Sequence, residues 1–270
     1  FQTIYQMDSN GQNKVQVAND DNGLLVPSSV PGFGHNQVSP DGSYIAAVSN
    51  QDQTAVTLSL YSSKSETPAK LTSDLVPYDY LSFFNGFSPS GQYYAYTTLG
   101  QSDTVLATAH VQDMQGNEIL KVDNTLFTTF TADGKGIIVL SFDPTQQKIV
   151  EIQKVDVASG NVSSVTPMPT SDTDQGLFAR PFLSPDGKDL YYFSEANLYK
   201  VALSNGTPTV VNEFKGTTGI AYVAPDQKNI VLLDYMGEQA FDLALYNMST
   251  GQVTPIDQNI AHPMILGPLD

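Results

Sequence analysis

One arrangement of polar and hydrophobic positions recurs along the chain. A polar turn that opens with Ser, Thr or Ala and mostly continues Pro-Asp-Gly is followed by hydrophobic residues that do not alternate with polar ones. Such a run is typical of a strand buried on both faces. The five copies occupy residues 38–48, 87–96, 130–139, 183–192 and 223–232. The pattern therefore predicts a repeat built from buried strands.

The residues of the turn have distinct physical roles. Pro presets φ at about −65°, the Asp carboxylate accepts hydrogen bonds from nearby backbone N–H groups, and Gly adopts the positive φ that closes the turn. Two departures from this pattern are informative, because Ser90 stands in place of Asp and Gln227 in place of Gly. Ser90 still provides an oxygen that can accept a hydrogen bond.

The remainder of each repeat predicts a second hairpin. Its turn ends in Gly at positions 116, 160, 206 and 251, whereas residues 60–65 keep the spacing without Gly. Strands separated by turns in this way indicate antiparallel sheet, and no stretch holds a helical hydrophobic period over three turns. The copies begin about 40–53 residues apart, which is typical of a β-propeller with one blade per repeat.

The two ends of the chain are expected to form one blade together. Residues 4–17 predict an outer hairpin without inner strands, and residues 262–266 are similar to residues 180–184, which open a blade. We therefore expect a single all-β domain over 1–270: a six-bladed β-propeller of four-stranded antiparallel blades. In its composite last blade, residues 1–20 give the outer hairpin and 261–270 the inner strand, which hides exposed edges. Whether this blade has three or four strands stays open.

The repeated Ser-Pro-Asp-Gly turn, the buried strand after it and the Gly-terminated hairpin together resemble the repeats of TolB-type β-propellers. The resemblance covers nearly the whole chain and implies the fold. It leaves the function open, because such blades also occur in prolyl-oligopeptidase-like peptidases and oligogalacturonate lyases. TolB itself has an additional N-terminal α/β domain to which nothing here corresponds, so the resemblance is to the family and not to TolB itself.

Charge and composition narrow the class of partner. The chain has 12 Lys and Arg against 28 Asp and Glu, a net charge of −16, and no Cys. This excess disfavours nucleic acid and anionic membranes as partners, because both require clustered cations. No apolar run is long enough to span a membrane. A Cys-free, neutral-polar surface favours an extracytoplasmic protein, periplasmic, secreted or on the cell surface, with its leader or anchor removed. We expect a monomer.

Candidate ligand-binding residues follow from aligning the repeats on their turns. The position four residues before the turn opens would start the innermost strand of each blade, at one mouth of the central channel. It holds His35, Phe84, Phe127, Arg180 and Ile220, and by similarity His262. Two imidazoles and a guanidinium at one mouth would attract an anion or a carboxylate. Polar side chains that merely fill the mouth are the structural alternative.

Other candidate sites rest on fewer residues. Tyr78 and Tyr80 precede the inner strand of the second blade, where they would suit recognition of a protein or a sugar. A divalent metal could bind His35 and His262 as in the oligogalacturonate lyases, although two His need further ligands. Calcium could bind the acidic loops 19–23 and 171–176, although solvated turns explain them as well. His110 is expected mid-strand with a structural role.

These observations favour a binding or protein-interaction module without catalytic activity. Its partner would be a protein, a peptide, or a small anionic or carbohydrate ligand, and no cofactor is expected. The main alternative is an enzyme working in the channel, such as a metal-dependent polysaccharide lyase or a hydrolase. A third interpretation is a structural propeller within a longer surface protein. No G-x-S-x-G or H-E-x-x-H motif occurs in the sequence.

Overall fold

The computed structural model describes residues 4–6, 12, 14–18, 24–25, 38–49, 57–62, 65–72, 85–102, 104–146, 148–168, 181–194, 197–204, 206–213, 217–223, 228–237 and 240–261. The regular structure of these residues consists of β-strands, as the repeats predict. Within these ranges, no helix has the length and hydrophobicity that crossing a bilayer requires.

Five sheets each contain four antiparallel strands in chain order. The first sheet holds β3 (Leu24–Leu25), β4 (Tyr44–Ser49), β5 (Thr57–Ser62) and β6 (Ser65–Thr72). The second holds β7 (Asn85–Phe87), β8 (Tyr93–Ser102), β9 (Val105–Asp113) and β10 (Glu118–Asp123). The third holds β11 (Thr125–Phe130), β12 (Gly136–Asp143), β13 (Lys148–Asp156) and β14 (Val162–Pro167). The fourth holds β15 (Phe182–Leu183), β16 (Asp189–Ser194), β17 (Asn197–Ala202) and β18 (Thr209–Glu213). The fifth holds β19 (Thr217–Val223), β20 (Asn229–Gly237), β21 (Ala240–Asn247) and β22 (Gln252–Ala261).

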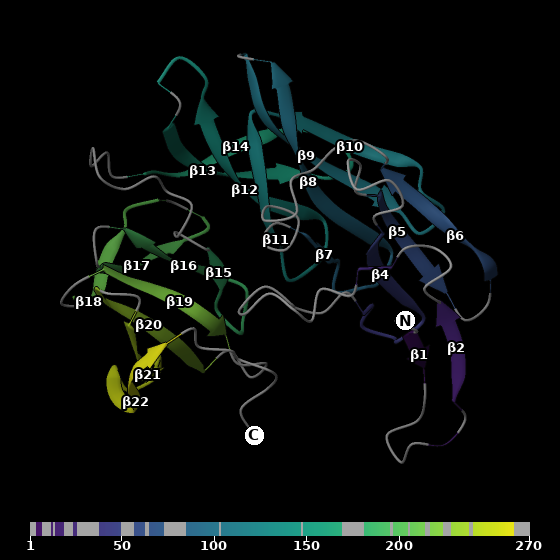
Figure 1. The fold of residues 1–270 in the computed structure, drawn as a ribbon. Helices are drawn as coiled ribbons and strands as arrows, with labels where there is room; N and C mark the ends of the chain where they lie inside the picture. Colours follow the sequence, from purple (N-terminus) through teal and green to yellow (C-terminus); the bar gives the residue numbers. More distant parts are fainter. Residues whose placement is uncertain are drawn as a thin grey trace.

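The sheets follow one another in an arc (Figure 1). The first strands β7, β11 and β15 lie towards its centre, and the fourth strands β6, β10, β18 and β22 lie at its periphery. A sixth, two-stranded sheet of β1 (Ile4–Gln6) and β2 (Val15–Ala18) lies beside the first sheet. The four-stranded blades and the N-terminal hairpin are thus confirmed.

The described blades do not form a closed ring. The β1–β2 hairpin and the β21–β22 pair lie at opposite ends of the arc in Figure 1, and β1 pairs only with β2 in the part of the chain that the structure describes. Residues 262–270, which were expected to complete the sixth blade, lie outside that part. The described fold is therefore five blades and a hairpin, and not the closed six-bladed ring that the repeats predicted.

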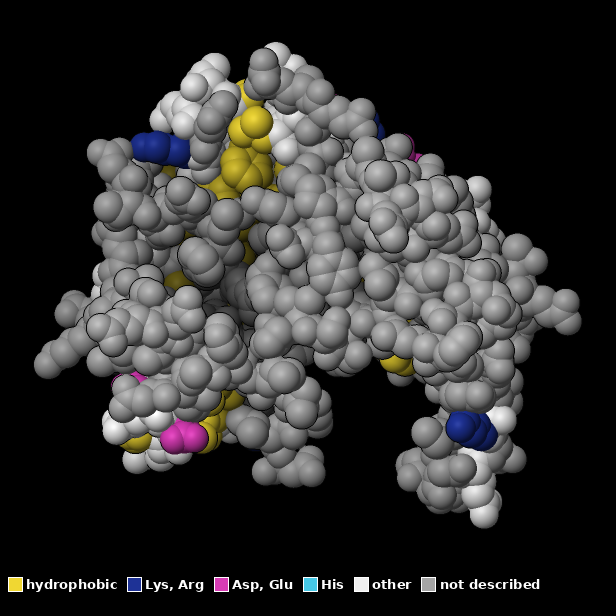
Figure 2. Space-filling model, viewed as in Figure 1, with side chains coloured by type: hydrophobic (Ala, Val, Ile, Leu, Met, Phe, Trp, Pro, Cys, Tyr) yellow, Lys and Arg dark blue, Asp and Glu magenta, His cyan; other side chains and the backbone are white. Residues whose placement is uncertain are grey.

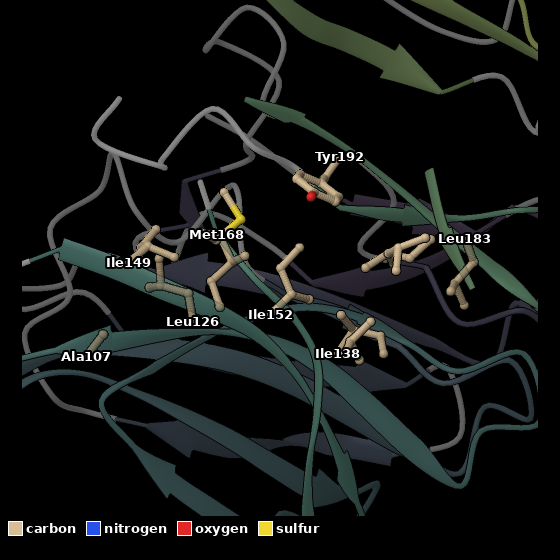
Figure 3. Close-up of a cluster of buried hydrophobic side chains, with 12 residues drawn as sticks. Ala107, Leu126, Ile138, Ile149, Ile152, Met168, Leu183 and Tyr192 are labelled. Atoms are coloured by element: carbon tan, nitrogen blue, oxygen red, sulfur yellow. The ribbon is translucent and has the colours of Figure 1, made fainter. Parts of the chain in front are cut away.

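Hydrophobic cores lie between neighbouring sheets. In β12, Ile137 and Val139 pack with the second sheet, whereas Ile138 and Leu140 pack with the fourth (Figure 3). All four side chains are fully buried. Burial of such a side chain contributes about 1.5–3 kcal/mol relative to its exposure. The hydrophobic run of β12 does not alternate because both faces of this strand contact a neighbouring blade.

The outer strands differ from the inner ones in exposure. Residues 251–258, which include most of β22, are exposed, among them Val253 at 41% and Ile256 at 50%. Figure 2 shows hydrophobic side chains at the surface in the lower left of the view, where β21 and β22 lie. Ile119 on β10 and Val162 on β14 are exposed as well. Burial thus decreases from the first strands to the fourth.

Candidate functional site

Antiparallel order gives every sheet two unlike ends. The turns that join the first strand to the second, and the third to the fourth, lie at one end, which we call the turn end. The turn that joins the second strand to the third lies at the other end, together with the connection to the next sheet. We call this the linker end. The repeated Pro-Asp-Gly motif therefore belongs to the turn end.

Hydrogen bonds organise the first of these turns. The Ser39 hydroxyl donates to Asp41 Oδ1 at 2.6 Å, and the same oxygen accepts the Ser43 N–H at 3.0 Å. Ser39 Oγ also accepts the Tyr44 N–H at 2.9 Å, and Gly42 has a φ of 69°. Both hydrogen bonds to the carboxylate favour its ionised form. They lower the pKa of Asp41 to about 2, with the bond from Ser39 as the largest cause.

The same bonds recur in two later turns. The Thr131 hydroxyl donates to Asp133 at 2.7 Å, and the Ser184 hydroxyl donates to Asp186 at 2.6 Å. Each of these bonds is the largest cause of a lowered pKa for the carboxyl that it reaches. In the second turn Ser90 replaces the carboxylate and lies 3.2 Å from the Ser88 hydroxyl. The turn end therefore presents ionised carboxylates on the first, third and fourth sheets.

The turns of successive sheets also contact one another. The glycine of each turn lies beside the second residue of the preceding turn, in the pairs Gly91 with Pro40, Gly134 with Pro89, and Gly187 with Ala132. A Cβ added at Gly187 would lie only 2.5 Å from the Ala132 Cβ. Four turns thus form one continuous row across the first four sheets. Glycine is favoured in them for its positive φ, and at Gly187 it is also needed for this close approach.

At the linker end, Asn124 alone joins β10 to β11. It has a positive φ of 57°, which Asn tolerates better than most residues. Its side chain accepts the Leu106 N–H at 3.1 Å and donates to the Thr104 carbonyl at 3.1 Å. Its own carbonyl accepts the Phe142 N–H at 2.8 Å. Asn124 therefore ties the two sheets together, through its side chain to the second sheet and through its main-chain carbonyl to the third.

Most of the predicted ligand residues cannot be located relative to this frame. Those outside the described residues are His35, Tyr78, Tyr80, Phe84, Arg180 and His262. Phe127 is described, and its side chain is 1% exposed in the core between the second and third sheets. Its ring lies 5.3 Å from that of Phe130, and it approaches Gly86 of β7. Phe127 is therefore a core residue whose ring is not accessible to a ligand, whereas the alignment placed it at the channel mouth.

The first sheet departs from the alignment in another way. Val38 pairs with Ile45, so an unbroken strand would place residue 35 opposite Val48. Leu25 pairs with Val48 instead. Among the described residues, β4 is thus paired on this side by two separate stretches, Leu24–Leu25 and Val38. Counting back from the turn assumes one continuous strand, and the prediction for His35 itself lies outside the described residues.

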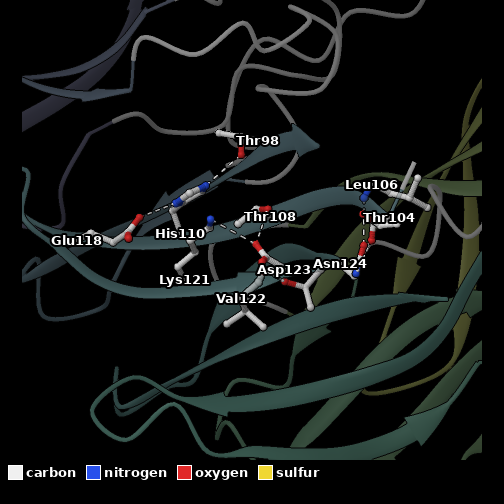
Figure 4. A network of polar contacts seen from close by, with 11 residues as sticks. Thr98, Thr104, Leu106, Thr108, His110, Glu118, Lys121, Val122, Asp123 and Asn124 are labelled. Atoms are coloured by element: carbon white, nitrogen blue, oxygen red, sulfur yellow. Dashed lines mark hydrogen bonds and ion pairs between the residues drawn. The ribbon is translucent and has the colours of Figure 1, made fainter. Parts of the chain in front are cut away.

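A polar network on the second sheet was not anticipated from the sequence (Figure 4). His110 lies in β9, as expected, with its Nε2 3.0 Å from Thr98 Oγ1 of β8 and its Nδ1 2.9 Å from Glu118 Oε2 of β10. The Tyr96 ring stacks on the imidazole at 4.9 Å between centroids, with 11° between the planes. The Tyr96 hydroxyl accepts a hydrogen bond of 2.8 Å from Gln112. The imidazole is thus contacted by Thr98, Glu118 and Tyr96, and Gln112 holds Tyr96 in place.

A second branch lies next to the first. Thr108, which pairs with Thr98 across β8 and β9, donates its hydroxyl to Asp123 at 3.0 Å. Lys121 pairs with His110 in register and lies 3.6 Å from Asp123. Sequence alone did not point to this site, because its members are scattered along three strands and become neighbours only through cross-strand register. Among the described residues, no group of three or more His, Cys, Asp or Glu is placed to hold a metal.

Comparison with known proteins identifies the fold of the chain. No family model and no curated protein matches its sequence. TolB from Acinetobacter baumannii is similar in structure, with a TM-score of 0.55 and 18% identity over 95% of this chain and 60% of that one. An oligogalacturonate lyase in complex with manganese gives a TM-score of 0.60 and 12% identity over 95% and 72%. A puromycin-hydrolyzing peptidase of Mycobacterium tuberculosis gives 0.61 and 12% over 96% and 42%. The chain thus spans 60% of the TolB chain and shares the β-propeller fold of TolB-type and related proteins.

Proposed function

We propose that this propeller is a binding module that holds a protein, a peptide, or a small anionic or carbohydrate ligand at its linker end. The proposal rests on one observation, which is that the connections between sheets at that end differ greatly in length. Residues 73–84 connect β6 to β7 and residues 168–181 connect β14 to β15, whereas Asn124 alone connects β10 to β11. Long connections in a compact domain are mostly functional, since shorter ones suffice to join neighbouring sheets.

The composition of these connections agrees with recognition. They contain Tyr78, Tyr80 and Arg180, and the segment between the two parts of the interrupted first strand contains His35. Tyr and Arg are enriched at binding surfaces, and a guanidinium pairs with a carboxylate through two parallel hydrogen bonds. Arg180 is one of only 12 Lys and Arg residues in a chain whose net charge is −16. We further propose that residues 262–270 complete the sixth blade beside β1, and that the protein works outside the cytoplasm as TolB-like proteins do.

Calorimetric titration with citrate and with trigalacturonate tests the proposal, because these probes represent a small carboxylate and an acidic sugar. We expect saturable binding to at least one of them and at least a tenfold weaker affinity in Arg180→Gln. Lys154→Gln, at the turn end of the third sheet, is the matched control and should bind like the parent protein. Equal affinity in the Arg180 variant, or no binding of either probe, would refute the proposed ligand class.

The second candidate function is a metal-dependent lyase or hydrolase acting in the channel. It is favoured by the structural likeness to the manganese-bound oligogalacturonate lyase. Elemental analysis of the purified protein separates the two candidates. Stoichiometric manganese or zinc that is lost in His35→Ala would support the enzyme, and retention of the metal in that variant would exclude His35 as a ligand.

A further inference from the structure

The polar network of the second sheet has the connectivity of a nucleophile, a base and an orienting acid. We propose that Thr98, His110 and Glu118 form an acyl-transfer site that hydrolyses small esters. The two contacts of the imidazole, 3.0 Å to Thr98 and 2.9 Å to Glu118, lie within the range required between nucleophile, base and orienting group. This activity goes beyond the proposed binding function and does not depend on it.

The chemistry of the partners determines the tautomer of the imidazole. An ionised Glu118 carboxylate can only accept a hydrogen bond, so the facing His110 Nδ1 must carry a proton. In the neutral ring the lone pair is then on Nε2, where it accepts the Thr98 hydroxyl proton. This is the state in which an imidazole acts as a general base toward a hydroxyl group.

Packing keeps the three groups in this geometry. Thr98 is 8% exposed, and the His110 side chain is 12% exposed. The Glu118 side chain, at 47% exposure, reaches the surface, so the network runs from the interface between sheets to the solvent. Tyr96 covers the imidazole face and is itself held by Gln112. A group held by neighbouring strands needs little reorganisation before reaction.

The reaction balances without a cofactor. Thr98 Oγ attacks the ester carbonyl carbon as its proton passes to His110 Nε2, and that proton then goes to the departing alkoxide, which leaves as the alcohol. A water molecule attacks the resulting Thr98 ester with His110 as base, which releases the carboxylic acid and restores the hydroxyl. Glu118 touches neither substrate nor leaving group and acts as a positioning residue. Lys121, the register partner of His110, is the cation that we assign to the developing oxyanion.

The chain provides a matched control for the nucleophile. Thr108 lies directly opposite Thr98 and donates to the Asp123 carboxylate, but it has no imidazole partner among its described contacts. Thr98→Val and Thr108→Val remove the same atoms from neighbouring positions. A purely structural role for the network predicts similar effects of both variants, whereas an acyl-transfer site predicts that only the Thr98 variant loses activity.

Turnover of p-nitrophenyl acetate and covalent labelling with a fluorophosphonate, mapped by mass spectrometry, provide the test. We expect one label on Thr98, retained in Thr98→Ser and Thr108→Val and abolished in Thr98→Val. Glu118→Gln should lower kcat by roughly 10²–10⁴-fold with little change in KM. Urea unfolding of each variant verifies that it is folded. A folded parent protein that neither turns over the ester nor carries the label on Thr98 would overturn the proposal.

Discussion

The polar side chains of the turn end find their partners within a few residues along the chain. Ser39 reaches Asp41, Thr131 reaches Asp133, and each carboxylate also accepts a backbone N–H two residues later. Such local bonds form whenever the turn forms, so they depend little on the rest of the fold. Their main electrostatic consequence is that the carboxylates stay ionised into the acidic range.

Removing the hydroxyl of the first turn should raise the pKa of Asp41. In the folded protein this pKa is about 2, below its ordinary value of 3.8, so the carboxylate stabilises the fold above about pH 4 and this stabilisation is lost as the pH falls towards 2. In Ser39→Ala we expect the pKa to move back towards its ordinary value, as measured by NMR titration of the carboxyl carbon. Asp186, which keeps its own Ser184, should titrate unchanged in the same spectra. An unchanged Asp41 would show that the hydroxyl is not the cause.

At the scale of the elements, contacts between sheets determine which positions tolerate substitution. Strands such as β12 contribute alternate residues to two cores, so the second, third and fourth sheets are stabilised from both sides. The row of turns adds a second set of contacts between sheets at the turn end. Gly187 in this row is therefore constrained by the neighbouring blade as well as by its own φ.

Two glycines separate these effects. Gly187 and Gly251 have nearly equal φ, 67° and 71°, but an added Cβ meets Ala132 at 2.5 Å in the first case and nothing within 4 Å in the second. We expect Gly251→Ala to lower the free energy of unfolding by about 1–2 kcal/mol through φ alone. Gly187→Ala should lower it by about 1–3 kcal/mol more through overpacking. Urea unfolding measures both values. Equal losses in the free energy of unfolding would mean that the contact between neighbouring turns does not limit the size of the side chain at position 187.

At the scale of the whole molecule, repulsion among acidic side chains destabilises the folded arrangement of the sheets. With 28 Asp and Glu against 12 Lys and Arg, the folded chain concentrates a net charge of −16 that the extended chain would spread out. Such self-repulsion keeps a protein soluble but destabilises its compact state. Salt shortens the range of this repulsion from about 30 Å at 0.01 M to about 3 Å at 1 M.

Salt should therefore stabilise this protein at neutral pH. We expect the thermal midpoint at pH 7 to rise between 10 mM and 0.5 M sodium chloride, by about 2–4 °C for each kcal/mol recovered. Scanning calorimetry measures the shift. Near pH 4.2, where the net charge approaches zero, the same change in salt should have little effect. A midpoint at pH 7 that is unchanged or lowered by salt would show that specific ion pairs outweigh the net repulsion.

Local structure and the repeat could be predicted from the amino-acid sequence alone. The Pro-Asp-Gly turns, the strands buried on both faces and the Gly-terminated hairpins were all predicted, because turn chemistry and burial patterns act between residues that are close in the chain. The position of His110 within a strand was predicted for the same reason. The prediction of four-stranded antiparallel blades followed from these local features and is confirmed.

Which residues of different strands and sheets become neighbours follows from the tertiary fold. The structure showed that Phe127 turns into a core, and that Thr98 and Glu118 meet at His110. These outcomes depend on strand register and on contacts between blades, and a shift of register by one residue would reverse which face a side chain occupies. Hydrophobic pattern records that a residue is buried or exposed, but it does not record which distant residue becomes its neighbour.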